Sequence, residues 1–276
     1  MEFLYDARAA EVTQDADGVT LTVERADGAR EPIRGAWLIG ADGARSAVRK
    51  SLGIGFEGQT IPELYLTLST PFPFHDHVER LTNIAYISDP DEWFVLLRTA
   101  SLWRVLLPTD PDEPEEVMLS DARIEERMQQ VLPAAAPYEI RHRTAYRVHE
   151  RVADRYLAGR VLLAGDAAHV NNPLGGMGMN GGIHDALNLA EKLAQVWRGA
   201  DAALLGRYER QRQKVAREVV QQQALRNRAL LNQKDPATRQ AFLDDLRATA
   251  EDPARHRAHL LRSSMIQSLR DLEAVA

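Results

Sequence analysis

The segment that most constrains the fold of this 276-residue chain is a glycine-rich stretch, GDAAHVNNPLGGMGMNGG, at residues 165–182. It contains six glycines and joins an apolar run, RVLLA, to a helical pattern, IHDALNLAEKLAQVW. A loop that only reverses the chain needs about one or two glycines, so this composition predicts a ligand that lies against the main chain. Asp166 follows the apolar run, at the strand end where open α/β sheets bind ligands, and its carboxylate can accept hydrogen bonds from ribose hydroxyls.

The start of the following helix offers further groups to the same ligand. Gly175, Gly176 and Gly178 leave no Cβ between the backbone and a ligand. Met179 and Asn180 lie at the helix N-terminus, where free amides and the helix dipole favour an electron-rich or anionic edge. A flat heterocycle with carbonyl oxygens fits this position.

The same loop contains a pattern that resembles a dinucleotide fingerprint. Gly176, Gly178 and Gly181 give G-x-G-x-x-G, and Asp201 follows about twenty residues later. Eleven residues separate Ala164, the last apolar residue of the strand, from Gly176, and no second strand carries Asp201. We therefore reject this pattern as a Rossmann signature.

A second loop, GADGARSAVRK, follows another apolar strand at residues 40–50. Asp42 and Gly43 form its turn, and Arg45 and Arg49 lie at the head of a short basic helix, from which arginines can reach phosphate oxygens. An ordinary charged surface helix explains the same residues equally well.

Between the two loops the sequence predicts an antiparallel sheet. Apolar, β-branched and aromatic residues gather in runs at 63–74, 81–88, 92–100, 102–109 and 139–152. One amphipathic helix interrupts them, with Ser120 or Asp121 as its cap and Pro133 after its end.

Strands and helices are also predicted on either side of this region. Strands are expected at 19–24 and 32–40, and the continuously apolar end of the second predicts burial on both faces. Apolar residues of the helix after the glycine-rich loop form one face: Ile183, Ala186, Leu187, Ala190, Leu193, Ala194 and Trp197. The rest is helical, over roughly 202–232 and then in two segments opened by Asp235-Pro236 and Asp252-Pro253.

Composition limits the classes of function. The net charge is −6, from 34 Lys and Arg against 40 Asp and Glu, which argues against a nucleic-acid partner. There is no cysteine, which excludes disulfides and thiolate chemistry and suits a cytoplasmic location. Neither a signal peptide nor a membrane span is predicted. His75-Asp76-His77 lacks a third ligand, so no metal site is predicted.

Together, DGARSAVR and GRVLLAGDAAHVNNPLGGMGMNGGIHDALNLAEKLA resemble the Asp-Gly and Gly-Asp motifs of the FAD-dependent aromatic hydroxylases, the para-hydroxybenzoate hydroxylase and ubiquinone-hydroxylase type. The likeness extends to the intervening sheet and to YERQRQKVA in the trailing helix. It implies a monooxygenase in which NADH or NADPH reduces FAD and a C4a-hydroperoxyflavin hydroxylates an aromatic or phenolic small molecule. The cofactor then carries the chemistry, so no catalytic side chain is predicted.

The resemblance also implies roles for individual residues. Asp166 binds the ribityl or ribose part of FAD, Pro173 lies beside the isoalloxazine ring, and the amides of Met179 and Asn180 point at the flavin O2 and N1. Gly175 and Gly178 allow the close approach. Asp42, with Gly43 and Arg45, lies by the pyrophosphate.

The implied fold is α/β (α+β): a para-hydroxybenzoate-hydroxylase-like fold with an antiparallel substrate sheet and C-terminal helices. We expect residues 1–58 and 151–200 to belong to the FAD-binding domain, 59–150 to the substrate-binding sheet and 201–276 to a helical region. Relatives begin with a β-α-β unit carrying G-x-G-x-x-G, and nothing before Asp42 matches it. We therefore expect an incomplete fold, an N-terminally truncated chain and weak FAD retention.

Three readings of the function stay open. The chain is an aromatic hydroxylase, a flavin-dependent halogenase or reductase on the same scaffold, or a non-catalytic fragment or subunit of a split flavoprotein. The W-x-W-x-I-P stretch of halogenases is absent from the sequence. A homo-oligomer, or a partner chain that supplies the missing unit, is the expected assembly, because incomplete sheets expose edges and apolar surface.

Overall fold

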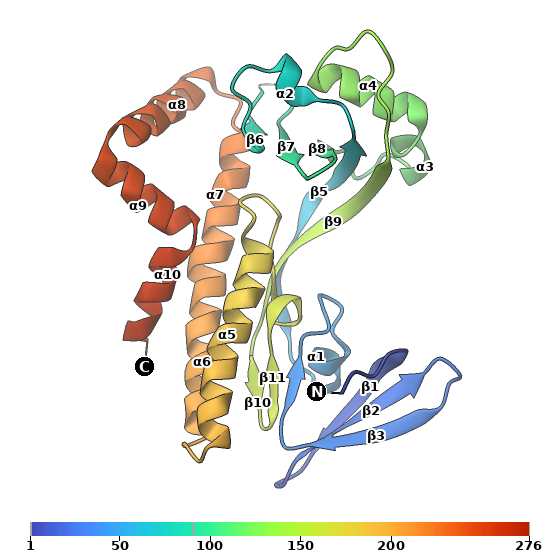
Figure 1. Cartoon of the computed structure of the whole chain (residues 1–276), viewed down its shortest axis with the longest axis vertical. Helices are drawn as coiled ribbons and strands as arrows, with labels where there is room; N and C mark the ends of the chain where they lie inside the picture. The colour runs from blue at the N-terminus through green and yellow to red at the C-terminus, as the bar shows by residue number, and fades with distance from the viewer. Residues whose placement is uncertain (1, 90, 276) are drawn as a thin grey trace. The chain divides into compact units, whose positions relative to one another are not determined.

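The computed structural model describes residues 2–89 and 91–275 (Figure 1). These residues form two compact units. The first combines Met1–Gln59, His149–Leu225 and Pro253–Ala276, and the second combines Thr60–Val148 and Arg226–Asp252. The functional division of the chain at residues 59, 151 and 201 stays a prediction.

The first unit contains two small sheets. One is antiparallel, with β1 (Ala7–Gln14), β2 (Val19–Arg25) and β3 (Arg30–Gly35) in that order. The other has the order β10 (Leu157–Ala158), β11 (Val161–Leu163) and β4 (Leu38–Gly40), and β11 runs parallel to β4. The second sheet ends directly before the two loops singled out in the sequence.

The single strand predicted over 32–40 is wrong. The chain leaves the first sheet at Gly35 and enters the second at Leu38, so one apolar run serves two sheets. Burial on both faces is also wrong at Ile39, whose side chain is 44% exposed. β4 is also an edge strand, with β11 as its one neighbour among the described strands.

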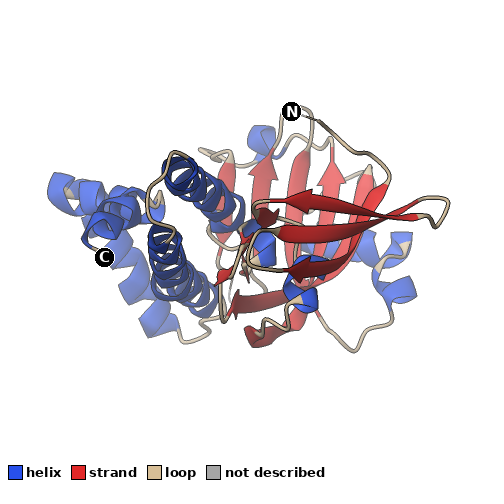
Figure 2. Cartoon of the chain, turned by 90° about the horizontal axis from the view of Figure 1, so that it is seen from below, coloured by secondary structure: helices blue, strands red, loops and turns tan. Residues whose placement is uncertain are grey.

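Two long helices, α5 (Met177–Trp197) and α6 (Ala203–Val215), lie side by side in the first unit (Figures 1 and 2). They pack with β11 around a core that includes Leu162, Leu189 and Tyr208. The shorter elements of this unit are α1 (Ala47–Ser51), η1 (Gly165–Ala167), β12 (His169–Val170), η2 (Ala216–Gln221), α9 (Pro253–Ser263), α10 (Ile266–Asp271) and η3 (Leu272–Ala274). α7 (Gln222–Leu231) begins in this unit.

The apolar face predicted for α5 is only partly buried: Leu193 packs against the core, but the largest side chains of the face are exposed. Ile183 is 49% exposed, Leu187 60% and Trp197 76%. The buried positions of the helix are Met177, Gly181, Asp185, Leu189 and Lys192. Two charged residues, Asp185 and Lys192, therefore lie among the buried positions of α5, while three large apolar side chains are exposed.

The sheet of the second unit is antiparallel, as predicted. β6 (Ile84–Ile87), β7 (Phe94–Arg98) and β8 (Trp103–Thr109) extend β5 (Phe56–Thr70) and β9 (His142–Ala153) in the order β12-β9-β5-β8-β7-β6. The helices of this unit are α2 (Phe74–His77), α3 (Glu115–Met118), α4 (Asp121–Val131) and α8 (Pro236–Glu251). The predicted α/β class, with an antiparallel sheet and C-terminal helices, is confirmed.

Local signals explain the helices of the second unit. Ser120 caps α4 by accepting a hydrogen bond from the Arg123 amide, and Ile124 and Met128 of that helix pack on the sheet. Asp235 caps α8 with proline at its first helical position, as predicted.

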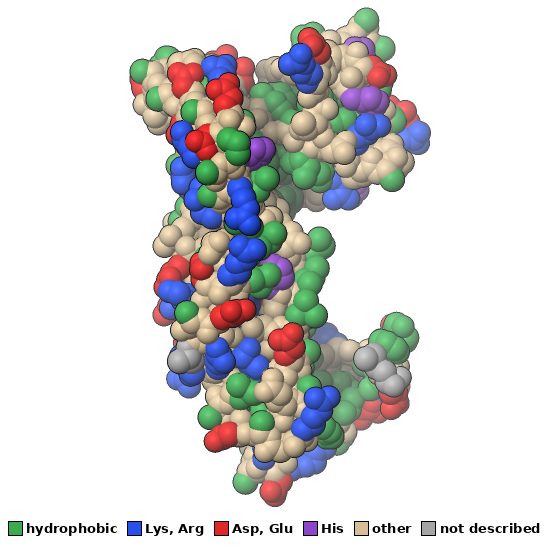
Figure 3. Space-filling model, turned by 60° about the vertical axis from the view of Figure 1, so that its left-hand side comes forward, with side chains coloured by type: hydrophobic (Ala, Val, Ile, Leu, Met, Phe, Trp, Pro, Cys, Tyr) green, Lys and Arg blue, Asp and Glu red, His purple; other side chains and the backbone are tan. Residues whose placement is uncertain are grey.

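The surface of the helical side carries Lys and Arg interspersed with Asp and Glu, with apolar side chains between them (Figure 3). Among the described residues, no helix combines the length and the apolar character that a membrane crossing needs.

The close approach of β5 to β9 gives a test of this arrangement. Gly58 has φ +141°, and a Cβ there would lie 1.9 Å from the carbonyl oxygen of Glu150. We expect Gly58→Ala to lower the free energy of unfolding by on the order of 3 kcal/mol, because strain and overpacking add. Gly28 is the matched control, since its φ is +83° but nothing lies within 4 Å of an added Cβ. Gly28→Ala should cost about 1 kcal/mol in urea unfolding followed by circular dichroism, and equal losses would contradict the argument.

Candidate functional site

The glycine-rich loop places a free carboxylate at the end of β11. The strand ends at Leu163, and the chain turns through η1, in which Asp166 is exposed. Among the residues that the structure describes, the Asp166 carboxylate has no hydrogen-bond or ion-pair partner. A carboxylate left open at this position is a ready acceptor for the hydroxyls of a ligand.

The N-terminus of α5 presents donors beside this loop. Gly176 occupies the N-cap position with φ +65°, a conformation that favours glycine, and it offers no side chain to cap the helix. In the described structure no acceptor is found for the first-turn amides of Met177, Gly178 and Met179. Asn180 turns its side-chain amide back to the Gly176 carbonyl at 2.9 Å. The backbone amides of the first turn are therefore available as hydrogen-bond donors to a ligand.

A buried carboxylate holds the loop in place from inside. Asp185 on α5 is fully buried, and its Oδ2 accepts hydrogen bonds from the Gly165 amide at 2.9 Å and from His169 Nε2 at 2.7 Å. Its Oδ1 accepts from Nε of the buried Arg212 on α6 at 2.6 Å. The Asp185 carboxylate thus binds Gly165 before Asp166, His169 of β12 and Arg212 of α6.

The charges of this cluster are balanced within the protein. Burial alone would raise the pKa of Asp185, but the hydrogen bond from His169 and the charge of Arg212 outweigh burial and lower it. The Arg212 guanidinium also donates to the Gly181 carbonyl at 3.3 Å. The Tyr208 hydroxyl donates to the Leu163 carbonyl at 2.6 Å, which fixes the end of β11.

The second loop is organised by its own aspartate. Asp42 accepts hydrogen bonds from the Ser46 hydroxyl at 2.5 Å and from the amides of Ala47 and Val48 at 2.7 and 3.1 Å. Its carboxylate therefore caps α1. Gly43 has φ +80° with open space around it, and Arg45 is exposed.

Arg49 joins the two loops. It is 4% exposed, and its guanidinium donates to the carbonyls of Ala167 and Ala44, both at 2.8 Å. The same group lies 3.8 Å from the centre of the Phe56 ring. Arg49 is therefore buried between the loops and holds two backbone carbonyls, which favours neither a phosphate contact nor a charged surface position for this residue.

The predicted site residues therefore lie on loops that one arginine connects. The exposed ones are Asp42, Arg45, Asp166, Pro173, Gly175, Met179 and Asn180, and Gly43 and Gly178 are half-buried. The residues that hold the loops, Arg49, Asp185 and Arg212, were not predicted as a group. The signal for Arg212 is the YERQRQKVA segment, whereas the sequence around Asp185 carries no signal of a buried charge.

A profile of the protein family described as "FAD binding domain" matches residues 1–223. The para-nitrophenol 4-monooxygenase of Pseudomonas sp. (strain WBC-3) is 36% identical over 249 residues, which cover 87% of this chain and 60% of that protein. The 3-(3-hydroxy-phenyl)propionate/3-hydroxycinnamic acid hydroxylase of Klebsiella pneumoniae (strain 342) is 31% identical over 79% of this chain and 39% of its own length. The chain thus spans about 40–60% of these two relatives.

Solved structures that resemble this chain are also monooxygenases and hydroxylases. The crystal structure of p-nitrophenol 4-monooxygenase PnpA from Pseudomonas putida DLL-E4 matches with a TM-score of 0.86 and 34% identity, covering 95% of this chain and 66% of that one. A ternary complex of aklavinone-11 hydroxylase with FAD and aklavinone matches with a TM-score of 0.72 and 33% identity, over 81% and 43% of the two chains. The resemblance drawn from the two motifs is confirmed.

The buried carboxylate predicts a large loss of stability on neutralisation. Asp185→Asn should lower the free energy of unfolding by about 3–5 kcal/mol at pH 7, because Arg212 is left as an unpaired buried charge. Asp166→Asn, on the exposed side of the same loop, should change it by less than about 0.5 kcal/mol. Urea unfolding measures both, and similar losses would contradict the assigned roles.

The difference between wild type and Asp185→Asn should depend on pH. The pKa of Asp185 in the folded state lies below its ordinary 3.8, so its carboxylate stabilises the protein above that pH. The stabilisation is lost as the pH falls through the folded-state pKa. The two unfolding free energies should therefore converge below pH 3.8, and a constant difference down to the lowest folded pH would contradict this account.

Proposed function

Because the chain belongs to the family described as "FAD binding domain", we propose that it carries part of the FAD site of an NADH- or NADPH-driven monooxygenase that hydroxylates an aromatic or phenolic small molecule. The observation that carries the proposal is the loop between β11 and α5. It presents an open carboxylate, Asp166, and an uncapped helix start, Gly176 to Met179, on one rigid support.

The donor and acceptor chemistry of the loop fits a flavin nucleotide. The Asp166 carboxylate would accept hydrogen bonds from ribityl or ribose hydroxyls. The Met179 amide, in the uncapped first turn, would donate to the carbonyl edge of the ring, and Pro173 would lie beside the ring. The Asn180 amide would donate to the ring beside it, while the Asn180 side chain is held by the Gly176 carbonyl. Gly175 and Gly178 would admit the ring close to the backbone.

The second loop would serve the pyrophosphate. The Asp42 carboxylate is occupied with α1, so its contribution is to order the backbone around Gly43. The space beside Gly43 is open, and the exposed guanidinium of Arg45 supplies positive charge next to it. FAD, when bound, supplies the hydride acceptance and oxygen activation, and these residues bind and orient it.

The exposed surfaces support a further segment that completes the site. Among the described strands β4 has one edge without a neighbour, and Ile183, Leu187 and Trp197 of α5 are exposed. We propose that a β-α-β segment of a partner chain pairs with β4 and covers α5. A homo-oligomer is the competing assembly.

The remaining parts of the proposal concern substrate and location. The antiparallel sheet of Thr60–Val148 is the proposed substrate-binding part, where Tyr65 packs edge-on against Trp93 with ring centres 5.5 Å apart. The absence of cysteine supports a cytoplasmic location.

FAD titration tests the proposal. We expect flavin fluorescence to be quenched saturably when the chain is combined with an N-terminal fragment of the para-nitrophenol 4-monooxygenase relative, and weakly or not at all by the chain alone. Asp166→Asn should weaken the affinity about tenfold or more, because a hydrogen bond to a charged group contributes about 1.5–3 kcal/mol.

The matched control is Asp201→Asn. Asp201 is also exposed, and its carboxylate only caps the local turn at Ala203. The affinity of the Asp201→Asn variant for FAD should stay within about twofold of that of wild type. The assignment would be overturned if the two substitutions had equal effects, or if FAD bound neither to the chain alone nor to the chain combined with the N-terminal fragment. NADH and NADPH oxidation with a panel of phenols then tests the activity.

A further inference from the structure

Lys192 is a buried cation without a carboxylate partner. It lies on the inner side of α5 and is 8% exposed. Its Nζ donates to Asn188 Oδ1 at 2.8 Å, and no described carboxylate lies within 4.0 Å of it. Burial lowers the pKa of Lys192, and the charge of Arg207 lowers it further. Buried charges in proteins are normally paired, so the partner of this ammonium has to come from elsewhere.

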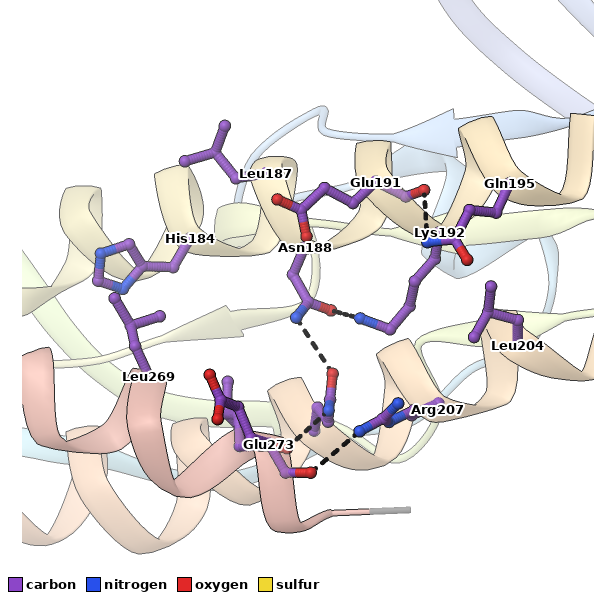
Figure 4. Close-up of a pocket in the computed structure, with 12 residues that line it drawn as sticks. His184, Leu187, Asn188, Glu191, Lys192, Gln195, Leu204, Arg207, Leu269 and Glu273 are labelled. Atoms are coloured by element: carbon purple, nitrogen blue, oxygen red, sulfur yellow. Dashed lines mark hydrogen bonds between the residues drawn. The ribbon is translucent and has the colours of Figure 1, made fainter.

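The ammonium borders a cavity of about 480 Å³ within the first unit (Figure 4). α5 and α6 form two walls, and α10 with η3 closes the third side. Leucines contributed by all three sides line it: Leu187, Leu204, Leu269 and Leu272. The volume is within the range of small-molecule sites, about 300–1,000 Å³.

A second cation faces the same cavity. The Arg207 guanidinium donates to the carbonyls of Val275 and Glu273 at 2.8 and 3.1 Å, so its partners are neutral. Gln211 is fixed beside it, donating to the Leu272 carbonyl at 2.7 Å and accepting from Asn188 at 3.1 Å. Hydrogen bonds therefore hold the polar groups at this end of the cavity in place, and Lys192 and Arg207 bring positive charge to it.

Two acidic side chains also line the cavity, and the charge of one of them, Glu191, partly offsets the lowering of the Lys192 pKa. Glu191 and Glu273 are both exposed, and no ion pair joins either of them to Lys192 or Arg207 in the described part of the chain.

We propose that this cavity binds an organic anion, with a carboxylate or phosphate head at Lys192 and an apolar body against the leucines. The head would complete the hydrogen bonding of the ammonium and neutralise its charge. The apolar body would gain from removing the leucine surface from water. This site is independent of FAD, since none of the flavin-loop residues lines it.

Calorimetric titration of the full chain tests the proposal. Octanoate and octyl phosphate should both bind saturably, and octanamide, with the same body and no charge, should bind at least tenfold more weakly. If one anion binds and the other does not, the head group is identified. Equal binding of octanamide, or equal binding of inorganic phosphate and octyl phosphate, would overturn the proposal.

Substitutions locate the binding. Lys192→Met keeps the length of the side chain and removes its charge, and it should weaken octanoate binding at least tenfold. The matched control is Lys234→Met, at an exposed lysine outside the cavity, which should leave the affinity unchanged. If circular dichroism shows that Lys192→Met does not fold, the relative affinities of wild type for octanoate and octanamide decide whether the site requires an anionic head group.

Glu273→Gln tests whether the chain supplies its own anion. Its carboxylate lies at the cavity, so it could pair with Lys192 after a change of rotamer. We expect octanoate to bind wild type and Glu273→Gln within about threefold of each other. Binding by Glu273→Gln alone would assign the counter-ion to Glu273 and overturn the proposal.

Discussion

The arrangement of the first unit depends on one buried carboxylate. Asp185 joins an amide of the glycine-rich loop, a histidine of β12 and an arginine of α6 within 2.9 Å. An isolated charge at this depth would be prohibitively costly, so the cluster forms as a whole or not at all. The loop it holds is therefore rigid although it is rich in glycine, and Asp166 is presented to solvent at a fixed position.

Rigid support explains how a loop with few side chains can serve as a binding site. Gly176 supplies the left-handed turn, and the helix that follows leaves its first amides unpaired. Arg49 fastens this loop to the second one through the Ala167 carbonyl. Groups held in this way lose little freedom when a ligand binds, and the lower entropic cost of binding favours affinity.

Much of the fold could be predicted from the sequence, because its signals are local. Runs of apolar, β-branched and aromatic residues predict the antiparallel sheet, and Ser120 and Asp235 mark helix starts. What failed depends on tertiary contacts: the break between β3 and β4 at Gly35, and the buried role of Arg49. The loop residues of the candidate site stand out by composition, whereas the cluster around Asp185 unites residues that are far apart in the chain.

α5 shows most clearly why the sequence pattern was insufficient. A surface helix normally turns its apolar side inward and its charges outward. Here Asp185 and Lys192 are inside, and Leu187 and Trp197 are outside. The inward charges have local reasons, since one anchors the glycine-rich loop and the other borders a cavity. Leu187 lines the same cavity, whereas Ile183 and Trp197 are exposed to water, which is a poor environment for apolar side chains. Because Ile183 and Trp197 are apolar and exposed, this part of α5 is best explained as an interface.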